Sequence, residues 1–204
     1  AAPDRIPLIR GLEGSCPGED DLKALCAAFG TTSAAPMLHV AGITPEADLP
    51  LLQPAETVPI GAAEFASLWR QFNGGGTKID LVALGSPHFS TNECRKLAEL
   101  LAGRPVHPNV AVVVTVGRGT LARIREEGIE ARLAKSGVTI VSDLCWCSIS
   151  EPVFPPQARV LITNSGKYAH YAPGLCGRDV RFGSLADCAH AAMTGTVPND
   201  LPQW

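Results

Sequence analysis

The chain has 204 residues, a formal net charge of −3 at pH 7, 46% hydrophobic residues and 18% charged residues. This length and composition support one substantial domain, or two small ones, with a real core, and they argue against a disordered chain. The slight negative charge gives no reason to expect nucleic acid or an acidic membrane surface as a partner. We expect no membrane partner either, because no apolar run approaches the roughly 20 residues of a membrane helix.

The start of the chain and its cysteines bear on its origin and compartment. The first residues, AAPDRIPLIRGLEG, lack the basic-then-apolar order of a signal peptide and an initiator Met, so we expect a processed chain or a fragment of a longer one. Seven cysteines lie at irregular spacing in a chain too large to need disulfide staples. This pattern predicts reduced thiols in a cytoplasmic protein.

The sequence of residues 1–61 predicts an irregular segment of helix, strand and loop. EDDLKALCAAFGTT (19–32) favours a helix whose acidic start suits the helix macrodipole. PMLHVAG (36–42) predicts a strand, and TPEADLPLLQPAETVPIG (44–61), with four prolines, predicts a loop. We therefore expect this segment to differ in architecture from residues 62–204.

Residues 62–204 alternate between helix and strand patterns. After a helix at 62–75, apolar runs predict strands at 79–85, 110–117, 138–142 and 159–163, and a short strand from 180. Helices are predicted at 90–103, capped by Ser90 or Thr91, at 119–137, with a bend at Gly128, and from Ser184. Continuous apolar strands separated by helices are typical of a parallel sheet covered on both faces. We therefore predict an α/β, doubly wound, parallel-sheet domain over residues 62–204.

The segments that follow the predicted strands are the first place to look for a site, because ligands of open α/β sheets bind outside the carboxyl ends of the strands. After the first four strands these segments span residues 85–90, 117–120, 142–152 and 164–174. They hold a dense polar set, namely Ser86, His88, Arg118, Asp143, Cys145, Cys147, Ser165, Lys167, Tyr168 and His170. Polar residues are common in such loops, so the clustering favours a site without proving one.

Cys145 and Cys147 leave several explanations open. The pair is compatible with one buried and one surface thiol, with zinc, or with an iron–sulfur cluster. Structural zinc sites favour a gap of two to four residues, and no second Cys/His pair lies at matching spacing. A disulfide between them is disfavoured in a reducing compartment. An iron–sulfur cluster accepts thiolates from several loops, and an open iron position acts as a Lewis acid.

Two other motifs have ordinary alternatives. Ser86 and His88 do not form a hydrolase motif, because no Gly-x-Ser-x-Gly elbow surrounds the serine. Lys167 follows Ser165 at a strand tip, where an ammonium is well placed to hold a carboxylate; a surface lysine is the alternative.

Four blocks of the sequence resemble, in order and spacing, the catalytic part of aconitase X. They are GLEGSCPGEDDLKALCAAFGTTSAAPMLHVAGITPEA (11–47), VALGSPHFSTNECRKLAELL (82–101), VSDLCWCSISEP (141–152) and TNSGKYAHYAPG (163–174). The resemblance implies a layout like the Fe–S domains of aconitase, with an iron–sulfur cluster in the cleft. It also implies dehydration of a small hydroxy acid, which is cis-3-hydroxy-L-proline in bacterial relatives and mevalonate 5-phosphate in archaeal ones.

The resemblance also implies metal ligands. Many relatives have Cys-Pro-His, with a cluster-binding cysteine, where this chain has Ser86-Pro87-His88. The third loop of relatives commonly contains Asp-Thr-Cys with a ligand cysteine, and Asp143-Leu144-Cys145 matches it. Cys145 is therefore the expected ligand, with Cys147 and Ser86 as further candidates.

By the same resemblance, the block from Asn164 to Tyr171 is expected to line the substrate site. The expected substrate-binding residues are Ser86, His88, Asn164, Ser165, Lys167 and Tyr168. Lys167 and Ser165 are expected to be catalytic, with Lys167 pairing with the carboxylate and stabilising the enediolate charge, and Ser165 adding hydrogen bonds. The block of Glu19, Asp20, Asp21 and Lys23 matches a family motif that either touches substrate or supports a loop.

The family enzyme also has an earlier portion of the catalytic domain and a swivelling domain, whose serine is expected to be the general base. Residues 1–61 are then expected to continue a larger domain, and the isolated chain is expected to be inactive. The variant Ser-Pro-His and the additional Cys147 favour cis-3-hydroxy-L-proline as substrate. Two other hypotheses are an α/β binding module that has lost its cluster and, on the two cysteines alone, a zinc or thiol redox protein.

Overall fold

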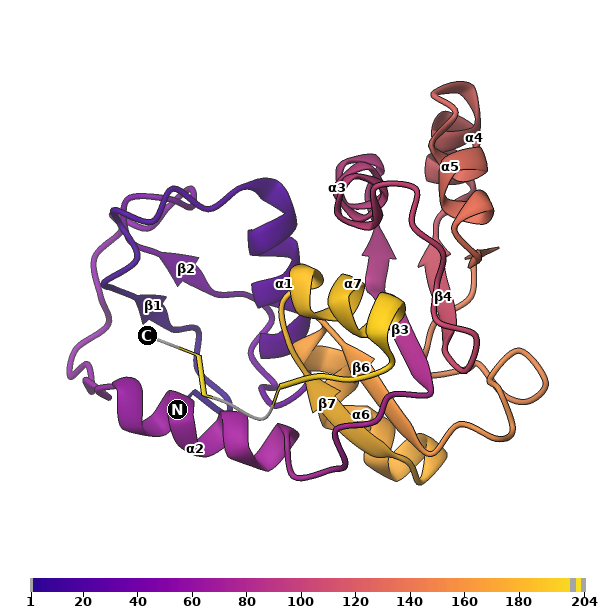
Figure 1. Cartoon of the computed structure of the whole chain (residues 1–204). Helices are drawn as coiled ribbons and strands as arrows, with labels where there is room; N and C mark the ends of the chain where they lie inside the picture. Colours follow the sequence, from indigo (N-terminus) through magenta and orange to yellow (C-terminus); the bar gives the residue numbers. More distant parts are fainter. Residues whose placement is uncertain (1, 199–200, 203–204) are drawn as a thin grey trace.

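A five-stranded parallel sheet forms the centre of the molecule in the computed structural model, which describes residues 2–198 and 201–202 (Figure 1). The strand order is β5-β4-β3-β6-β7, and every neighbouring pair is parallel. The strands span β3 Leu81–Phe89, β4 Ala111–Val116, β5 Val138–Ser142, β6 Val160–Thr163 and β7 Asp179–Phe182. The predicted parallel α/β sheet is confirmed.

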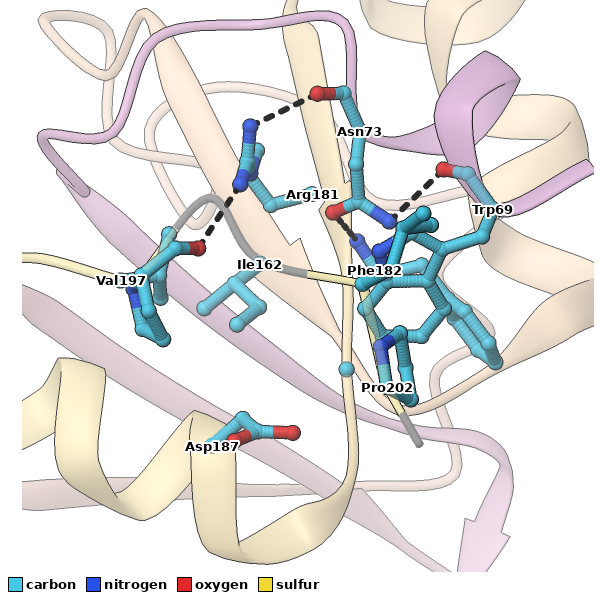
Figure 2. Close-up of a pocket in the computed structure, with 11 residues that line it drawn as sticks. Trp69, Asn73, Ile162, Arg181, Phe182, Asp187, Val197 and Pro202 are labelled. Atoms are coloured by element: carbon cyan, nitrogen blue, oxygen red, sulfur yellow. Dashed lines mark hydrogen bonds between the residues drawn. The ribbon is translucent and has the colours of Figure 1, made fainter. Parts of the chain in front are cut away.

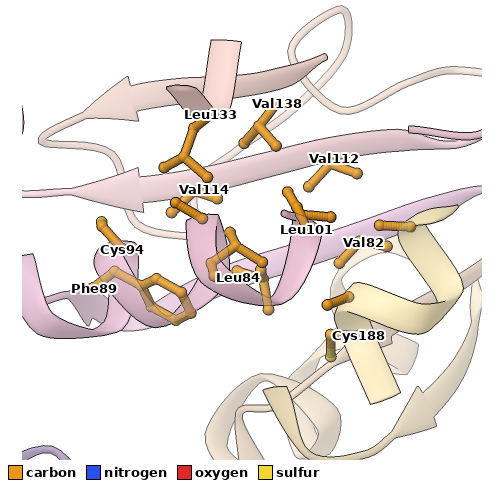
Figure 3. Packing of buried hydrophobic residues seen from close by; sticks show 14 of the residues in the cluster. Val82, Leu84, Phe89, Cys94, Leu101, Val112, Val114, Leu133, Val138 and Cys188 are labelled. Carbon is orange, nitrogen blue, oxygen red and sulfur yellow. The ribbon is translucent and has the colours of Figure 1, made fainter. Parts of the chain in front are cut away.

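Two hydrophobic clusters cover the two faces of this sheet. Alternate side chains of β3 and β4, such as Val82, Leu84 and Val114, pack on one face beneath α3, α5 and α7 (Figure 3). The intervening side chains, such as Leu81 and Val113, pack on the other face beneath α6. The helices are α3 Thr91–Leu101, α4 Arg118–Glu126, α5 Ile129–Lys135, α6 Gly166–Cys176 and α7 Leu185–Thr194. The chain is therefore wound on both faces, as its continuous apolar strands predict.

The helix start predicted at Ser90 is confirmed, but the single helix predicted over residues 119–137 is not. Ser90 caps α3, since its Oγ accepts from the Glu93 N–H (3.1 Å) and its own N–H donates to Glu93 Oε2 (2.9 Å). The expected single helix with a bend is wrong: α4 and α5 are separate helices. Gly128 lies between them at φ +69°, a left-handed conformation that ends the first helix.

The N-terminal part contains less regular structure than the sheet. β1 Leu8–Ile9 pairs in parallel with β2 His39–Val40, so the predicted strand at 36–42 is reduced to two residues. α1 Glu19–Phe29 packs on α6, and a Cβ at Gly166 would lie 3.3 Å from the Cβ of Ala28. α2 Ala62–Phe72 follows the predicted proline-rich loop and packs on β7. The predicted division at residue 61 stays a prediction.

Two of the predicted strand-tip loops are regular structure instead. β3 continues through residues 85–89 with an irregular register, and Gly85 (φ +97°) makes this possible because a Cβ there would overlap Thr115. Residues 166–176 form α6, although Pro173 and Gly174 lie within it. Tyr168, Ala169 and Ala172 give α6 a buried face against the sheet, and this packing outweighs poor helix propensity. Of the described helices, none has the length and apolar character to span a bilayer.

Candidate functional site

The segment that carries Cys145 and Cys147 is anchored to the core by the residue between them. The Trp146 side chain is 1% exposed and its Nε1–H donates to the Leu84 carbonyl at 2.7 Å. Its ring also packs against Tyr168, with the ring centroids 5.2 Å apart. The two flanking cysteines instead line an open cleft. The Cys-Trp-Cys pattern thus presents two thiols on either side of one buried anchor.

Three further contacts hold the backbone before and after Cys145. Asp143 has φ +58°, and its carboxylate accepts from the Arg118 N–H (3.0 Å) and Nε–H (2.7 Å). The His88 ring nitrogen Nε2 lies 2.9 Å from the Leu144 carbonyl oxygen. The N–H and Oγ–H of Ser148 both donate to the Cys145 carbonyl, at 2.8 and 2.9 Å. The loop is therefore tied to β3, to the start of α4 and to itself.

The electrostatics of this loop favour an ionised Asp143 and a protonated Cys147 thiol. The backbone N–H of Arg118, followed by its side chain, lowers the pKa of Asp143 below its usual range. Burial raises the pKa of the Cys147 thiol, and the nearby Cys145 raises it further. A cation at the cleft would reverse this trend and favour the thiolates.

The cleft has a volume of about 560 Å³ and lies between α1 on one side and the cysteine loop with α6 on the other. Its described lining is Cys26, Ala27, Gly30 and Thr31 from α1 and the turn that follows it, Cys145 and Cys147 from the loop, and Lys167, Tyr171 and Leu175 from α6. The side chains offer thiols on both walls, one ammonium, and small residues that leave room for a ligand. This is the size of a pocket for a small molecule.

The structure brings together three of the sequence-predicted site residues, Cys145, Cys147 and Lys167. The other predicted residues do not line the cleft: Ser86, His88, Asn164, Ser165 and Tyr168. Cys26 lines it but was not predicted, since the sequence pattern of α1 does not indicate which of its faces meets α6. Its signal lay in the matched block 11–47, where it is one of two cysteines.

Of those five residues, His88 contacts the cysteine loop, Ser86 lies near the end of β3, and Ser165 and Tyr168 lie just beyond β6. Ser165 caps α6, its Oγ accepting from the Tyr168 N–H at 3.0 Å and donating to the Ser86 carbonyl. The Tyr168 side chain is 1% exposed, and burial raises its pKa. Ser86 is 4% exposed, and its hydroxyl has no hydrogen-bond partner among the described residues. A buried hydroxyl without a partner is costly, so this one is a candidate contact for a ligand.

The donor chemistry fits part of an iron–sulfur site. Cys145 and Cys147 are close enough to interact, and thiolates are the donors that iron–sulfur clusters use. Within the described ranges, no three His, Cys, Asp or Glu side chains are grouped closely enough to hold a metal ion. The described residues therefore offer two neighbouring thiols, and a complete set of ligands would need further donors.

The block of acidic residues and Lys23 supports the β3 tip. The Lys23 ammonium contacts Asp20 Oδ1 (3.0 Å), the Glu93 carboxylate and the His88 carbonyl (3.2 Å). Ser90 Oγ–H donates to Asp20 Oδ2 at 3.0 Å. Burial raises the pKa of Glu93, and the Lys23 ammonium only partly offsets this effect. The first turns of α1 and the β3–α3 junction are thus joined by a charge cluster.

A second, smaller pocket of about 260 Å³ lies beside the edge strand β7 (Figure 2). Arg181, 3% exposed, donates to the carbonyls of Asn73 (2.7 Å), Gly75 (3.1 Å) and Pro198 (3.0 Å). Asn73 Oδ1 accepts from the Phe182 N–H (3.0 Å) and so covers the strand edge. None of the cysteines lines this pocket, and its contacts tie the chain before β3 and after α7 to the sheet.

Comparison with known protein families and structures gives consistent matches. Residues 1–70 match the family model "Aconitase X second domain" and residues 79–194 match "Aconitase X third domain". A cis-3-hydroxy-L-proline dehydratase of Pseudomonas aeruginosa is 49% identical over 206 residues, and one of Hypocrea jecorina is 44% identical over 210 residues. A phosphomevalonate dehydratase large subunit of Methanosarcina mazei is 32% identical over 193 residues.

The matches cover nearly all of this chain but only part of the relatives. The first two cover 98% of this chain and 36% and 35% of the relatives, and the third covers 94% and 46%. The crystal structure of Thermococcus kodakaraensis aconitase X in its holo-form matches with a TM-score of 0.81 at 27% identity. This match covers 93% of this chain and 48% of that chain. The chain thus spans between about a third and a half of the proteins it matches.

Proposed function

The chain belongs to the aconitase X family, and from this premise we propose that it forms part of a hydro-lyase that removes water from cis-3-hydroxy-L-proline. The observation that carries the proposal is the cleft in which Cys145, Cys147 and Lys167 converge. The choice of substrate is supported by the two dehydratases at 49% and 44% identity, against 32% for the phosphomevalonate dehydratase subunit.

Lys167 is the residue that we propose to hold the substrate carboxylate. It lies in the first turn of α6, where the helix N-terminus adds to the attraction for an anion, and its side chain lines the cleft. Dehydration removes a proton from the carbon beside the carboxylate and hydroxide from the next carbon. The negative charge that develops on the carboxylate side would be stabilised by the Lys167 ammonium.

Cys145 is the proposed cluster ligand, with Cys147 as a second thiol from the same loop. When bound, an iron–sulfur cluster with an open iron position supplies a Lewis acid for the departing hydroxyl. The part of this chain is to hold the thiols: Trp146, Leu144 and Asp143 fix the loop backbone on both sides of Cys145.

Ser86 is proposed to meet the substrate or cluster through its unpaired hydroxyl, and Ser165 to fix the Ser86 backbone and the start of α6. Asn164 is proposed to contact the substrate from the β6 tip. Tyr168 would have to leave the core to touch a ligand, so we propose that it supports the Trp146 anchor.

The complete enzyme is proposed to contain further parts. The chain spans 36% of the Pseudomonas aeruginosa dehydratase, which leaves room for an earlier portion of the catalytic domain and a swivelling domain that would supply the base. We also propose a cytoplasmic location, since the seven cysteines are free thiols. The alternative, a binding module without a cluster, is favoured by the serine at position 86 and by the absence of a three-ligand group among the described residues.

Turnover of two substrates by the complete protein tests this function. We expect loss of cis-3-hydroxy-L-proline, followed by proton NMR, and no reaction with mevalonate 5-phosphate. Lys167→Met should reduce turnover far more than His170→Ala, a change at an exposed residue on the same helix that does not line the cleft. Absence of turnover in an iron-loaded complete protein would favour the binding module.

A further inference from the structure

The Lys23 ammonium is fully committed to protein contacts. It has three N–H donors, and the structure gives it three acceptors: Asp20, Glu93 and the His88 carbonyl. The side chains of Lys23 and Glu93 are 30% and 14% exposed, so the pair is partly shielded from water. Burial lowers the pKa of Lys23, but the hydrogen bonds and negative charges of Glu93 and Asp20 together outweigh burial and raise it. Lys23 therefore has no donor left for a substrate.

His88 continues this set of contacts toward the cysteines. Its carbonyl accepts from Lys23, and its ring lies 2.9 Å from the Leu144 carbonyl. A carbonyl oxygen only accepts, so Nε2 carries the proton in this contact. The next residue after Leu144 is Cys145. A continuous line of polar contacts thus runs from α1, in the region matching the second family domain, across the third-domain strand β3 to the cysteine loop.

We propose that Lys23 and His88 are positioning residues that hold the Cys145 loop in its ligand-ready position, acting in series from α1 through β3. Lys23 fixes the backbone at the β3 tip, and His88 transmits that position to Leu144 through its ring. The other anchors act differently. Trp146 holds the middle of the loop against the core, and Arg118 holds Asp143 at the start of the loop. The expected effect of these residues on iron binding rests on the proposed function, whereas their expected effect on the mobility of the loop does not.

The effect on the loop is tested by hydrogen exchange of the complete protein, measured by mass spectrometry. Lys23→Met and His88→Leu should each accelerate exchange in residues 143–148 about tenfold, as expected for loss of a hydrogen bond to a charged group or to a loop anchor. Exchange in β4 should not change. Because the contacts are in series, Lys23→Met combined with His88→Leu should accelerate exchange no more than His88→Leu alone.

Two matched variants separate positioning from general stability. Arg95→Met removes an exposed ion pair between α3 and the end of α4, Arg95 with Glu127 at 2.7 Å, and should leave exchange in residues 143–148 unchanged. His88→Gln keeps an N–H donor at a similar reach and should restore slow exchange. Equal acceleration in β4 and in the loop, or no rescue by glutamine, would overturn the proposal.

The cluster is tested separately, by iron content and the electron paramagnetic resonance spectrum of the reduced complete protein. We expect altered spectra in Lys23→Met and His88→Leu and an unchanged spectrum in Arg95→Met. An unchanged spectrum in all variants would overturn the role in ligand positioning. Iron missing from the unsubstituted complete protein would overturn the proposed function instead, and the exchange result would still decide the loop contacts.

Discussion

Replacement of Trp146 should destabilise the protein more than any other single change in the cysteine loop. The side chain is 1% exposed and its indole N–H is bonded to Leu84. Truncation of a core tryptophan to alanine costs about 3–5 kcal/mol, against about 5–15 kcal/mol for the whole stability of a typical domain. Trp146→Phe keeps much of the ring but removes the N–H that donates to the Leu84 carbonyl, and should lower the free energy of unfolding by about 1–3 kcal/mol.

Urea denaturation followed by far-ultraviolet circular dichroism measures both changes. Trp69→Phe is the control, because it makes the same chemical change at a half-buried ring on α2 that packs edge-to-face on Phe182, a type of contact that phenylalanine keeps. Its cost should be smaller than that of Trp146→Phe. If Trp146→Phe changed the free energy of unfolding by less than about 0.5 kcal/mol, the buried anchor would not have the importance given to it here.

Three further predictions concern single residues. Gly85→Ala should lower the free energy of unfolding by more than about 2 kcal/mol, measured in urea, because a Cβ at φ +97° would lie 2.6 Å from Thr115 Oγ1. Asp143→Asn should make stability depend less on pH under acidic conditions. The Arg118 contacts lower the pKa of Asp143, so the stability that the Asp143 carboxylate adds is complete above about pH 4, the ordinary carboxyl range. That stability is lost as the pH falls through the depressed pKa. A thermal melt of Asp143→Asn between pH 2 and 6 checks this, and an unchanged acid limb would contradict it. Ser86→Ala should raise stability by about 1 kcal/mol, since it removes a buried hydroxyl without a described partner, and a loss of stability would indicate a partner for that hydroxyl.

The sheet was predictable because its strands are short apolar runs, and because two of the helices between and after them, α3 and α7, begin at clear caps. Ser90 and Ser184 carry complete capping boxes, and the sequence indicates both directly. Elements with weak local signals were missed. β1 has two residues, and α6 contains Pro173 and Gly174, so its helix is a result of packing on the sheet rather than of propensity.

The location of the candidate site was predictable from the sequence, but only some of the residues that line it were. The rule that ligands bind beyond strand ends led to the loop of Cys145 and to Lys167. Contacts between distant segments carry no local pattern, which is why the entry of Cys26 into the cleft and the role of His88 at the loop were not predicted.

Iron content and turnover of the complete protein, purified without oxygen, test the central claim most directly. Cys145→Ala should lose iron, visible absorption and dehydration of cis-3-hydroxy-L-proline together, whereas Cys16→Ala, at an exposed cysteine that does not line the cleft, should retain all three. If Cys145→Ala left iron content and turnover unchanged, Cys145 would not be the cluster ligand and this account of the site would be wrong.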